Sequence, residues 1–205
     1  MAGSSEAALV SAALARNDRF LVEIVEAHGI CPFARGTRTS GRLHREVVLS
    51  TNVAVLTERV GALDAVEADI ALLLLPTFSG DPRALERLIT EVRAADETRR
   101  PPPFALAPFH PETPFDTTTP SRLVGLFRRS PDPTIQLVRF AALDAARRRA
   151  PDGKFFFDGS AAAWAALAAR PERGLSEQIS HDNFERLREA APALAQRLHN
   201  LRGQD

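Results

Sequence analysis

The stretch Asp69-Ile-Ala-Leu-Leu-Leu-Leu75 decides the fold. Its continuous apolar run has the length of a strand and predicts burial on both faces, as in a parallel sheet covered by helices. Upstream of it, the segment from Leu43 to Leu49 alternates in polarity and predicts a first strand. Thr51 or Asn52 can cap a helix that runs to about Val66 and leads the chain into the buried strand.

Downstream of the buried strand, the alternation of strands and helices continues. Pro82 suits the first turn of a helix that runs to about Asp96, and Phe104 to Phe109 predicts a third strand. Pro108 removes a backbone donor from that strand, which suits a place at the edge of the sheet. We therefore expect an α/β fold with a small parallel βαβαβ sheet flanked by helices in three layers. An α+β ferredoxin-like fold is the alternative.

The N-terminal part of the chain predicts two helices before the first strand. Residues 7–15 are rich in alanine and carry leucine and valine on one side. Asn17 or Asp18 can cap a second helix, which Gly29 would stop in the left-handed conformation. Glycine, threonine and serine make residues 35–42 a predicted loop.

The length of 205 residues fits a single domain with a proper core. We expect one domain over residues 1–205, with a core from about residue 18 to 150 and a helical C-terminal extension over about 151–205. Within that extension, residues 176–202 predict helical structure that is interrupted near Pro192.

Composition limits the classes of partner and of compartment. Lys+Arg and Asp+Glu both number 26, so net charge gives no reason to expect a nucleic-acid or anionic-membrane partner. Cys31 is the only cysteine, which excludes an internal disulfide and favours a reducing compartment. No apolar run approaches the length of a membrane span. These features predict a soluble cytoplasmic protein, and they leave its oligomeric state open.

His110 is the histidine with the most informative position. It directly follows the predicted third strand, and ligands of parallel α/β sheets bind at the carboxyl ends of the strands. The proline-rich loop of residues 111–120 that comes next is typical of the wall of a site. His110 is therefore a candidate general base or proton donor. A histidine that only satisfies hydrogen bonds at a strand end is the alternative.

Cys31 lies just beyond the end of a predicted helix, in Gly29-Ile-Cys-Pro-Phe-Ala34. Backbone N–H groups of a short helix start at Pro32 would point at its sulfur and lower the pKa of the thiol. The segment resembles half of a glutaredoxin-type motif, but Ala34 occupies the place of the second thiol. Monothiol chemistry is therefore possible, and a buried, inert cysteine is the alternative.

A candidate anion site lies in Arg129-Ser-Pro-Asp-Pro-Thr134. Ser130 and the following proline predict the start of a helix that runs to about Arg149, where free N–H groups, a hydroxyl and a guanidinium would meet. Gln136 and Arg139 are three residues apart and would both face this site on such a helix. A capped helix with solvated arginines is the alternative.

Together, four motifs resemble the DUF1415 family of uncharacterised bacterial proteins. These motifs are Cys-Pro-Phe-Ala (31–34), Phe-His-Pro (109–111) with Phe115, Arg-Ser-Pro-x-Pro-Thr-Ile-x-Leu-x-Arg (129–139) and Asn-x-x-x-Leu (183–187). The resemblance covers roughly residues 19–189 and implies that Cys31, His110, Arg129 and Arg139 belong together. It implies no activity. Gln136 stands where family members often have histidine, and residues 151–174 resemble an insertion.

The sequence-based hypothesis is an enzyme that acts on a small, anionic molecule. Cys31 would be the nucleophile or redox thiol of a transferase, hydrolase or monothiol redox enzyme, and His110 its base. Arg129, Ser130, Gln136 and Arg139 would bind the substrate. No dinucleotide, P-loop or zinc motif appears, so no cofactor and no metal ligand is assigned. A non-catalytic protein that binds a metabolite, metal or haem, and a structural or adaptor protein, are the alternatives.

Overall fold

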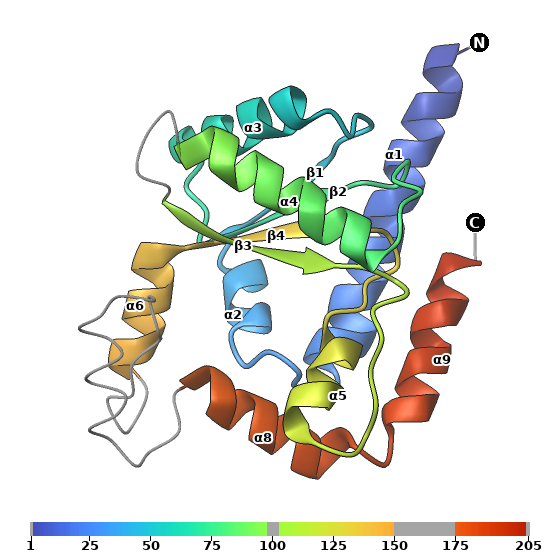
Figure 1. Cartoon of the computed structure of the whole chain (residues 1–205), viewed down its shortest axis with the longest axis vertical. Helices are drawn as coiled ribbons and strands as arrows, with labels where there is room; N and C mark the ends of the chain where they lie inside the picture. Colours follow the sequence, from blue (N-terminus) through green and yellow to red (C-terminus); the bar gives the residue numbers. More distant parts are fainter. Residues whose placement is uncertain (1, 98–102, 150–174, 204–205) are drawn as a thin grey trace.

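The structure is a computed structural model that describes residues 2–97, 103–149 and 175–203. Its described part is a mixed α/β fold with helices on both faces of one sheet (Figure 1). The sheet order is β1-β2-β4-β3, with β1 at Leu43–Val47, β2 at Ile70–Leu74, β3 at Phe104–Phe109 and β4 at Thr134–Arg139. The predicted α/β class and the three predicted strands are thereby confirmed.

The expected purely parallel sheet is wrong. β1 and β2 are parallel, but β4 lies between β2 and β3 and is antiparallel to both. The segment that becomes β4 is the one for which the sequence predicted a helix from Ser130 to Arg149. A helix, α6, begins only at Phe140 and runs to Arg149. The ferredoxin-like alternative is not confirmed.

Alternating burial explains why residues 134–139 form a strand. Ile135 and Leu137 have no exposed surface and join one core, whereas Gln136 lies on the opposite face, across from Leu72. Threonine, isoleucine and valine are favoured in strands, and Pro133 keeps the preceding backbone extended. Burial therefore alternates with a period of two residues, as in a strand, and the predicted helical spacing of Gln136 and Arg139 does not apply.

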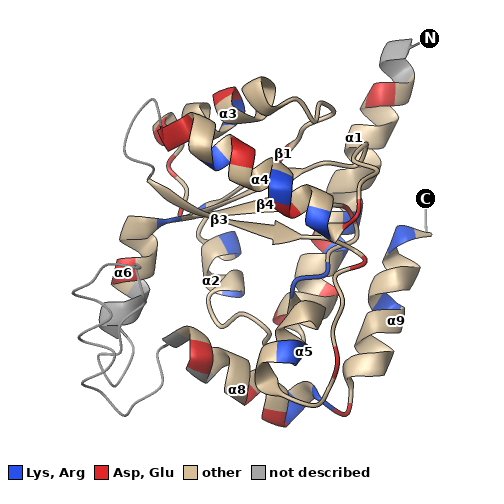
Figure 2. Cartoon of the chain, viewed as in Figure 1, with Lys and Arg blue, Asp and Glu red and all other residues tan. Residues whose placement is uncertain are grey.

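Two helices cover one face of the sheet (Figure 1). α3 runs from Val53 to Ala62 and is followed by a short 3-10 turn, Leu63–Ala65; α4 runs from Pro82 to Glu97. Asn52 caps α3 as predicted, because its side-chain oxygen accepts the N–H groups of Ala54 and Val55. Acidic and basic residues are interspersed along α4 (Figure 2).

The other face is covered by helices from both ends of the chain and by one helix, α5, from its middle (Figure 1). These are α1 (Ala2–Arg19), a π-helix η1 (Phe20–Glu26), α5 (Pro120–Phe127), α8 (Leu175–Leu187) and α9 (Ala191–Arg202). α1 continues directly into η1, so the predicted cap at Asn17 or Asp18 is wrong. Gly29 stops this helix with φ 58°, as predicted. The break between α8 and α9 agrees with the predicted interruption near Pro192.

Two further details bear on the sheet and the segment after Cys31. Pro108 does lie in an edge strand, and Arg93 donates to the carbonyl oxygen of Leu106 in the same strand. The predicted loop over residues 35–42 is wrong, because α2 spans Ala34–Thr39. Thr37 and Thr39 bond back to carbonyls four residues earlier in this helix. The resemblance to an insertion over residues 151–174 falls outside the described residues.

No helix among residues 2–97, 103–149 and 175–203 has both the length and the apolar character needed to cross a membrane.

Candidate functional site

The carboxyl ends of β2 and β3 and the start of β4 meet at one edge of the sheet. Thr134, the first residue of β4, pairs with Leu74 of β2 and with Phe109 of β3. His110 follows Phe109 directly, and the turn that carries Arg129 precedes Thr134. The antiparallel insertion of β4 therefore brings the histidine and this turn to the same edge, although the helix predicted there is absent.

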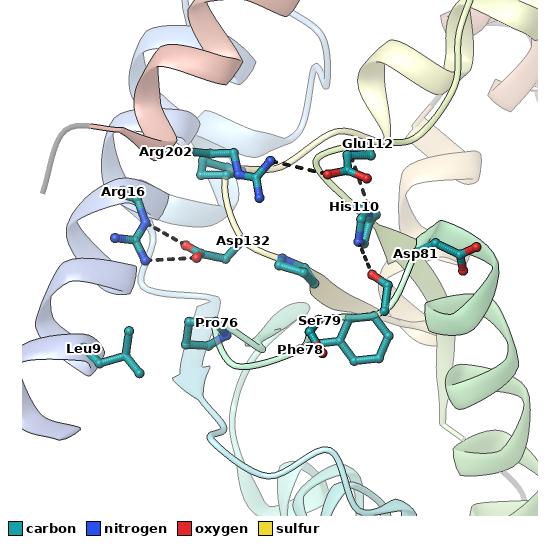
Figure 3. Close-up of a pocket in the computed structure, with 13 residues that line it drawn as sticks. Leu9, Arg16, Pro76, Phe78, Ser79, Asp81, His110, Glu112, Asp132 and Arg202 are labelled. Carbon is teal, nitrogen blue, oxygen red and sulfur yellow. Dashed lines mark hydrogen bonds and ion pairs between the residues drawn. The ribbon is translucent and has the colours of Figure 1, made fainter. Parts of the chain in front are cut away.

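A cavity of about 460 Å³ lies at this edge (Figure 3). Its walls are the loop of residues 76–81 after β2, His110 and Glu112 after β3, and the turn of residues 131–133 before β4. Arg16 of α1 and Arg202 of α9 complete it from the other side. Segments from both ends of the chain thus contribute to the lining of this open cavity.

His110 is buried in the wall of this cavity, with 5% of its surface exposed. Its Nδ1 accepts the backbone N–H of Glu112 at 3.1 Å, so Nε2 carries the proton and donates to the carbonyl oxygen of Gly80 at 2.9 Å. The ring also makes an edge contact with Phe78, with 6.4 Å between centroids. Both ring nitrogens are thereby occupied by backbone groups, which ties two loops of the cavity together.

Burial lowers the pKa of His110 below its ordinary value of 6.5, because a protonated ring would lose contact with water. The folded chain therefore binds fewer protons than the unfolded chain just below pH 6.5. The stability that the neutral ring contributes is present above pH 6.5 and is lost as the pH falls through the lower pKa of the folded state.

We predict that the imidazole of His110 titrates below pH 6.5 and keeps its proton on Nε2. An NMR titration of the histidine ring nitrogens measures both properties. The free energy of unfolding of the native chain should also fall more steeply below pH 6.5 than that of the His110→Gln variant. A midpoint at or above 6.5 would contradict the burial argument.

A buried ion pair borders the same cavity (Figure 3). Arg16 donates from Nε and Nη2 to the two carboxylate oxygens of Asp132, at 3.0 and 2.9 Å. Only 9% and 12% of the two side chains are exposed. The backbone carbonyl of Asp132 accepts the hydroxyls of Ser130 and Thr134. The pair therefore fixes the turn before β4 to the first helix.

A second pocket of about 310 Å³ adjoins the first, because both are lined by Glu112 and Arg202. Arg129 and Ser130 form one wall of this second pocket, and His199 of α9 lies on the other. We call the two pockets together the edge groove. It runs along the carboxyl edge of the sheet, between the loop after β3 and the last helix.

Two contacts hold the guanidinium of Arg129 in this groove, a hydrogen bond at Nε and an aromatic ring against its face. Nε donates to the carbonyl oxygen of Thr113 at 2.8 Å, and the group lies 4.7 Å from the centroid of the Phe115 ring. Nη1 and Nη2 have no hydrogen bond to any residue in the described ranges. Partial burial lowers the pKa of Arg129. Arg129 thus lines the second pocket with a guanidinium whose two outer nitrogens have no acceptor in the described ranges.

The other predicted anion ligands are differently placed. Ser130 is buried, and its hydroxyl is used within the turn, where it donates to the carbonyl oxygen of Asp132 at 2.6 Å. Gln136 lies in the middle of β4, between Leu72 and Ala107. The expected anion site at a helix start is therefore wrong in its backbone geometry, because no helix begins at Ser130.

Arg139 lies at the opposite edge of the sheet from His110, since it pairs with Phe104 at the start of β3. Its guanidinium donates to the carbonyl oxygens of Leu63, Val66 and Ala68, and it stacks 4.6 Å from the centroid of the Phe104 ring. These contacts give Arg139 a structural role, as they close the segment that leads into β2.

Cys31 is half-buried against the core on the sheet face that η1, α5, α8 and α9 cover. It lines neither pocket of the edge groove. The backbone N–H groups of Phe33 and Ala34 do approach its sulfur, as the sequence predicted. Burial nevertheless raises the pKa of the Cys31 thiol above its ordinary value of 9.0, because it outweighs those two groups. The expected lowering of the thiol pKa is therefore wrong.

We predict that Cys31 reacts slowly with iodoacetamide at neutral pH, and that its rate rises with a midpoint above pH 9.0. The same chain unfolded in urea is the control, since its thiol titrates without burial. A midpoint in the folded chain that lies below that of the unfolded chain would restore Cys31 as a candidate nucleophile.

The late Asn-x-x-x-Leu motif explains how the segment around Cys31 is held. Asn183 donates to the carbonyl oxygen of Ile30 at 2.8 Å, and Leu187 is buried in the same core. Arg186 donates to the carbonyl oxygens of His28 and Gly29. Helix α8 therefore satisfies backbone carbonyls of the turn that follows η1 and leads to Cys31.

Sequence reasoning missed four residues of the groove: Arg16, Glu112, Asp132 and Arg202. They are far apart in the chain, and only the folded topology brings them together. Asp132 lay within a recognised motif and could have been singled out as the carboxylate next to a conformationally restricted turn. Within the described ranges, no group of three or more histidine, cysteine and acidic side chains could hold a metal ion.

Comparison with known proteins relates the chain to one protein family. No curated protein and no solved structure matches it. One family model, described as "Protein of unknown function (DUF1415)", matches residues 13–169. That range contains the Cys-Pro-Phe-Ala, Phe-His-Pro and Arg-Ser-Pro motifs and covers most of the sequence, and the chain therefore belongs to the DUF1415 family.

Proposed function

We propose that the chain binds a small anionic molecule in the edge groove, with Arg129 as the principal ligand. The observation that carries this proposal is the state of the Arg129 guanidinium. Thr113 and Phe115 hold it at the wall of the second pocket, and Nη1 and Nη2 make no hydrogen bond to a described residue.

Such an arrangement favours binding because the arginine is already ordered. An arginine that is ordered only on binding loses rotamer freedom, whereas Arg129 has lost it in the unbound chain. Its two outer nitrogens present a planar pair of donors, which suits a carboxylate or a phosphate. Arg202 lines the same pocket and adds a second positive charge.

The remaining walls support this role. His110 is neutral and joins Gly80 to Glu112, so it sets the distance between the loops on either side of the groove. The Arg16–Asp132 pair fixes the turn that begins just after Arg129. Cys31 lines neither pocket, and both nitrogens of His110 are occupied. We therefore propose binding, and not cysteine chemistry, as the function that this geometry favours.

We predict that the native chain binds citrate or pyrophosphate at millimolar or lower concentration, and that Arg129→Gln weakens this binding by about tenfold to a hundredfold. This range corresponds to the loss of one or two charge-assisted hydrogen bonds. Isothermal titration calorimetry with each anion measures the dissociation constants. Arg129→Lys should restore binding only in part, because an ammonium cannot offer two parallel donors.

The matched control is Arg188→Gln. Arg188 is also an arginine over a phenylalanine ring, 5.5 Å from the centroid of Phe184, but it is exposed and lines neither pocket. This variant should bind the anions as the native chain does. Equal losses in the two variants would indicate unspecific attraction of anions to surface charge, and the proposal would then be wrong.

A further inference from the structure

We propose that the molecule bound in the edge groove is a small zwitterion, in its simplest form an α-amino acid. Its acidic group would lie on Arg129 and Arg202, and its ammonium group on the carboxylate of Glu112. This inference rests on the proposed function, because it uses the same arginines for the acidic group. It adds the chemical class of the ligand and a residue that determines specificity.

The backbone of Glu112 is fixed in the groove, and its side chain is largely exposed. Its backbone N–H donates to Nδ1 of the buried His110 at 3.1 Å. Its side chain lies at the junction of the two pockets, since Glu112 lines both of them. A ligand that occupies either pocket therefore lies beside Glu112.

The carboxylate of Glu112 is only loosely paired. Its Oε1 lies 3.9 Å from Nη1 of Arg202, which is longer than a hydrogen bond, and 68% of the Glu112 side chain is exposed (Figure 3). The charge of Glu112 also acts on Arg129 and on His110. The second pocket is thus lined by two arginines, Arg129 and Arg202, and by one carboxylate, that of Glu112, which keeps positions open for a donor of the ligand.

This arrangement discriminates between ligands by charge. A simple anion on Arg129 and Arg202 is repelled by Glu112, whereas a ligand that also carries an ammonium group removes this repulsion and donates hydrogen bonds to the carboxylate. A ligand whose acidic and amino groups are a few bonds apart matches the two arginines, Arg129 and Arg202, and the carboxylate of Glu112 in the same pocket. A free amine is repelled by the arginines in turn.

The rest of the molecule would lie in the first pocket. Leu9, Pro76, Phe78, Pro131 and Pro133 contribute apolar groups to this pocket, but most of its lining is polar. Arg16 is paired with Asp132 in its wall, so the two charges offset one another (Figure 3). A side chain of modest size that carries a polar group therefore suits this pocket.

Calorimetry with the full chain tests this inference. The standard L-amino acids are screened first, and the one that binds most tightly is compared with two matched probes. One probe lacks the amino group and the other lacks the carboxyl group. We expect the amino acid to bind about tenfold more tightly than either probe, which corresponds to one charge-assisted interaction.

Glu112→Gln should reverse this preference. The variant should bind the amino acid about fivefold more weakly, because an ion pair at an exposed site is worth about 1 kcal/mol. It should bind the probe without the amino group more tightly than the native chain does. Glu185→Gln, an exposed glutamate on α8 that lines neither pocket, is the control and should change neither affinity.

The outcomes separate the two proposals. If the probe without the amino group binds as well as the amino acid, or if citrate binds through Arg129 while no amino acid binds, the zwitterion is wrong and anion binding stands. If Arg129→Gln leaves every affinity unchanged, both proposals fail.

Discussion

Replacing Arg16 with methionine is expected to lower the free energy of unfolding by about 3 to 5 kcal/mol. The substitution leaves the carboxylate of Asp132 buried without its guanidinium partner, and the desolvation cost of an unpaired charge is large. It also releases α1 from the turn that precedes β4. Equilibrium unfolding in urea measures the loss.

Two further variants separate the charge from the packing. The double variant Arg16→Met, Asp132→Leu removes both charges and should recover most of the stability, since buried ion pairs replaced by apolar residues are often neutral. Arg122→Met breaks an exposed pair with Asp116, whose side chains are 65% and 43% exposed, and should cost less than about 1 kcal/mol. A loss for Arg16→Met no larger than that for Arg122→Met contradicts the account.

Replacing Gly125 with alanine is expected to destabilise the chain by about 3 kcal/mol. Gly125 lies in α5, and a methyl group there would overlap the backbone carbonyl of Pro114 and crowd Cβ of Phe115 at 3.0 Å. The backbone must shift to admit it, because a carbonyl cannot rotate away as a flexible side chain can. Phe115 supports the guanidinium of Arg129, so the shift should also weaken anion binding.

Gly61→Ala is the matched control for this substitution. Gly61 also lies in a helix, α3, but an added methyl group would meet no atom within 4 Å. Alanine is favoured over glycine in helices, so this variant should be more stable by about 0.5 kcal/mol. Thermal and urea unfolding of both variants should therefore give changes of opposite sign. A harmless Gly125→Ala would mean that the loop after β3 does not pack on α5 as described.

The elements that local patterns determine could be predicted from the sequence. The apolar run of β2, the cap at Asn52, the stop at Gly29 and the edge position of β3 each depend on neighbouring residues. β4 could not be placed in the same way. The two prolines just before it, Pro131 and Pro133, resemble a helix start, and only the two flanking strands make a strand the favoured state for residues 134–139.

The candidate site was predicted in part for the same reason. The edge position of His110 follows from its place after a strand, and Arg129 lies at the same edge. Arg139 lies at the opposite edge because residues 134–139 form an extended strand. Each residue of this strand adds about 3.3 Å to the distance from Thr134. Arg16 and Arg202 come from the two ends of the described chain, and no local pattern relates them to Arg129.

The most direct test of anion binding in the edge groove follows the arginine side chains themselves. In an NMR titration of the native chain with citrate, the Nε–Hε signals of Arg129 and Arg202 should shift to a common saturation point, with the Arg129 signal identified by its absence in Arg129→Gln. The signal of Arg139, at the far edge of the sheet, should not move. Saturation at Arg139 or Arg188, with Arg129 unchanged, would contradict the account.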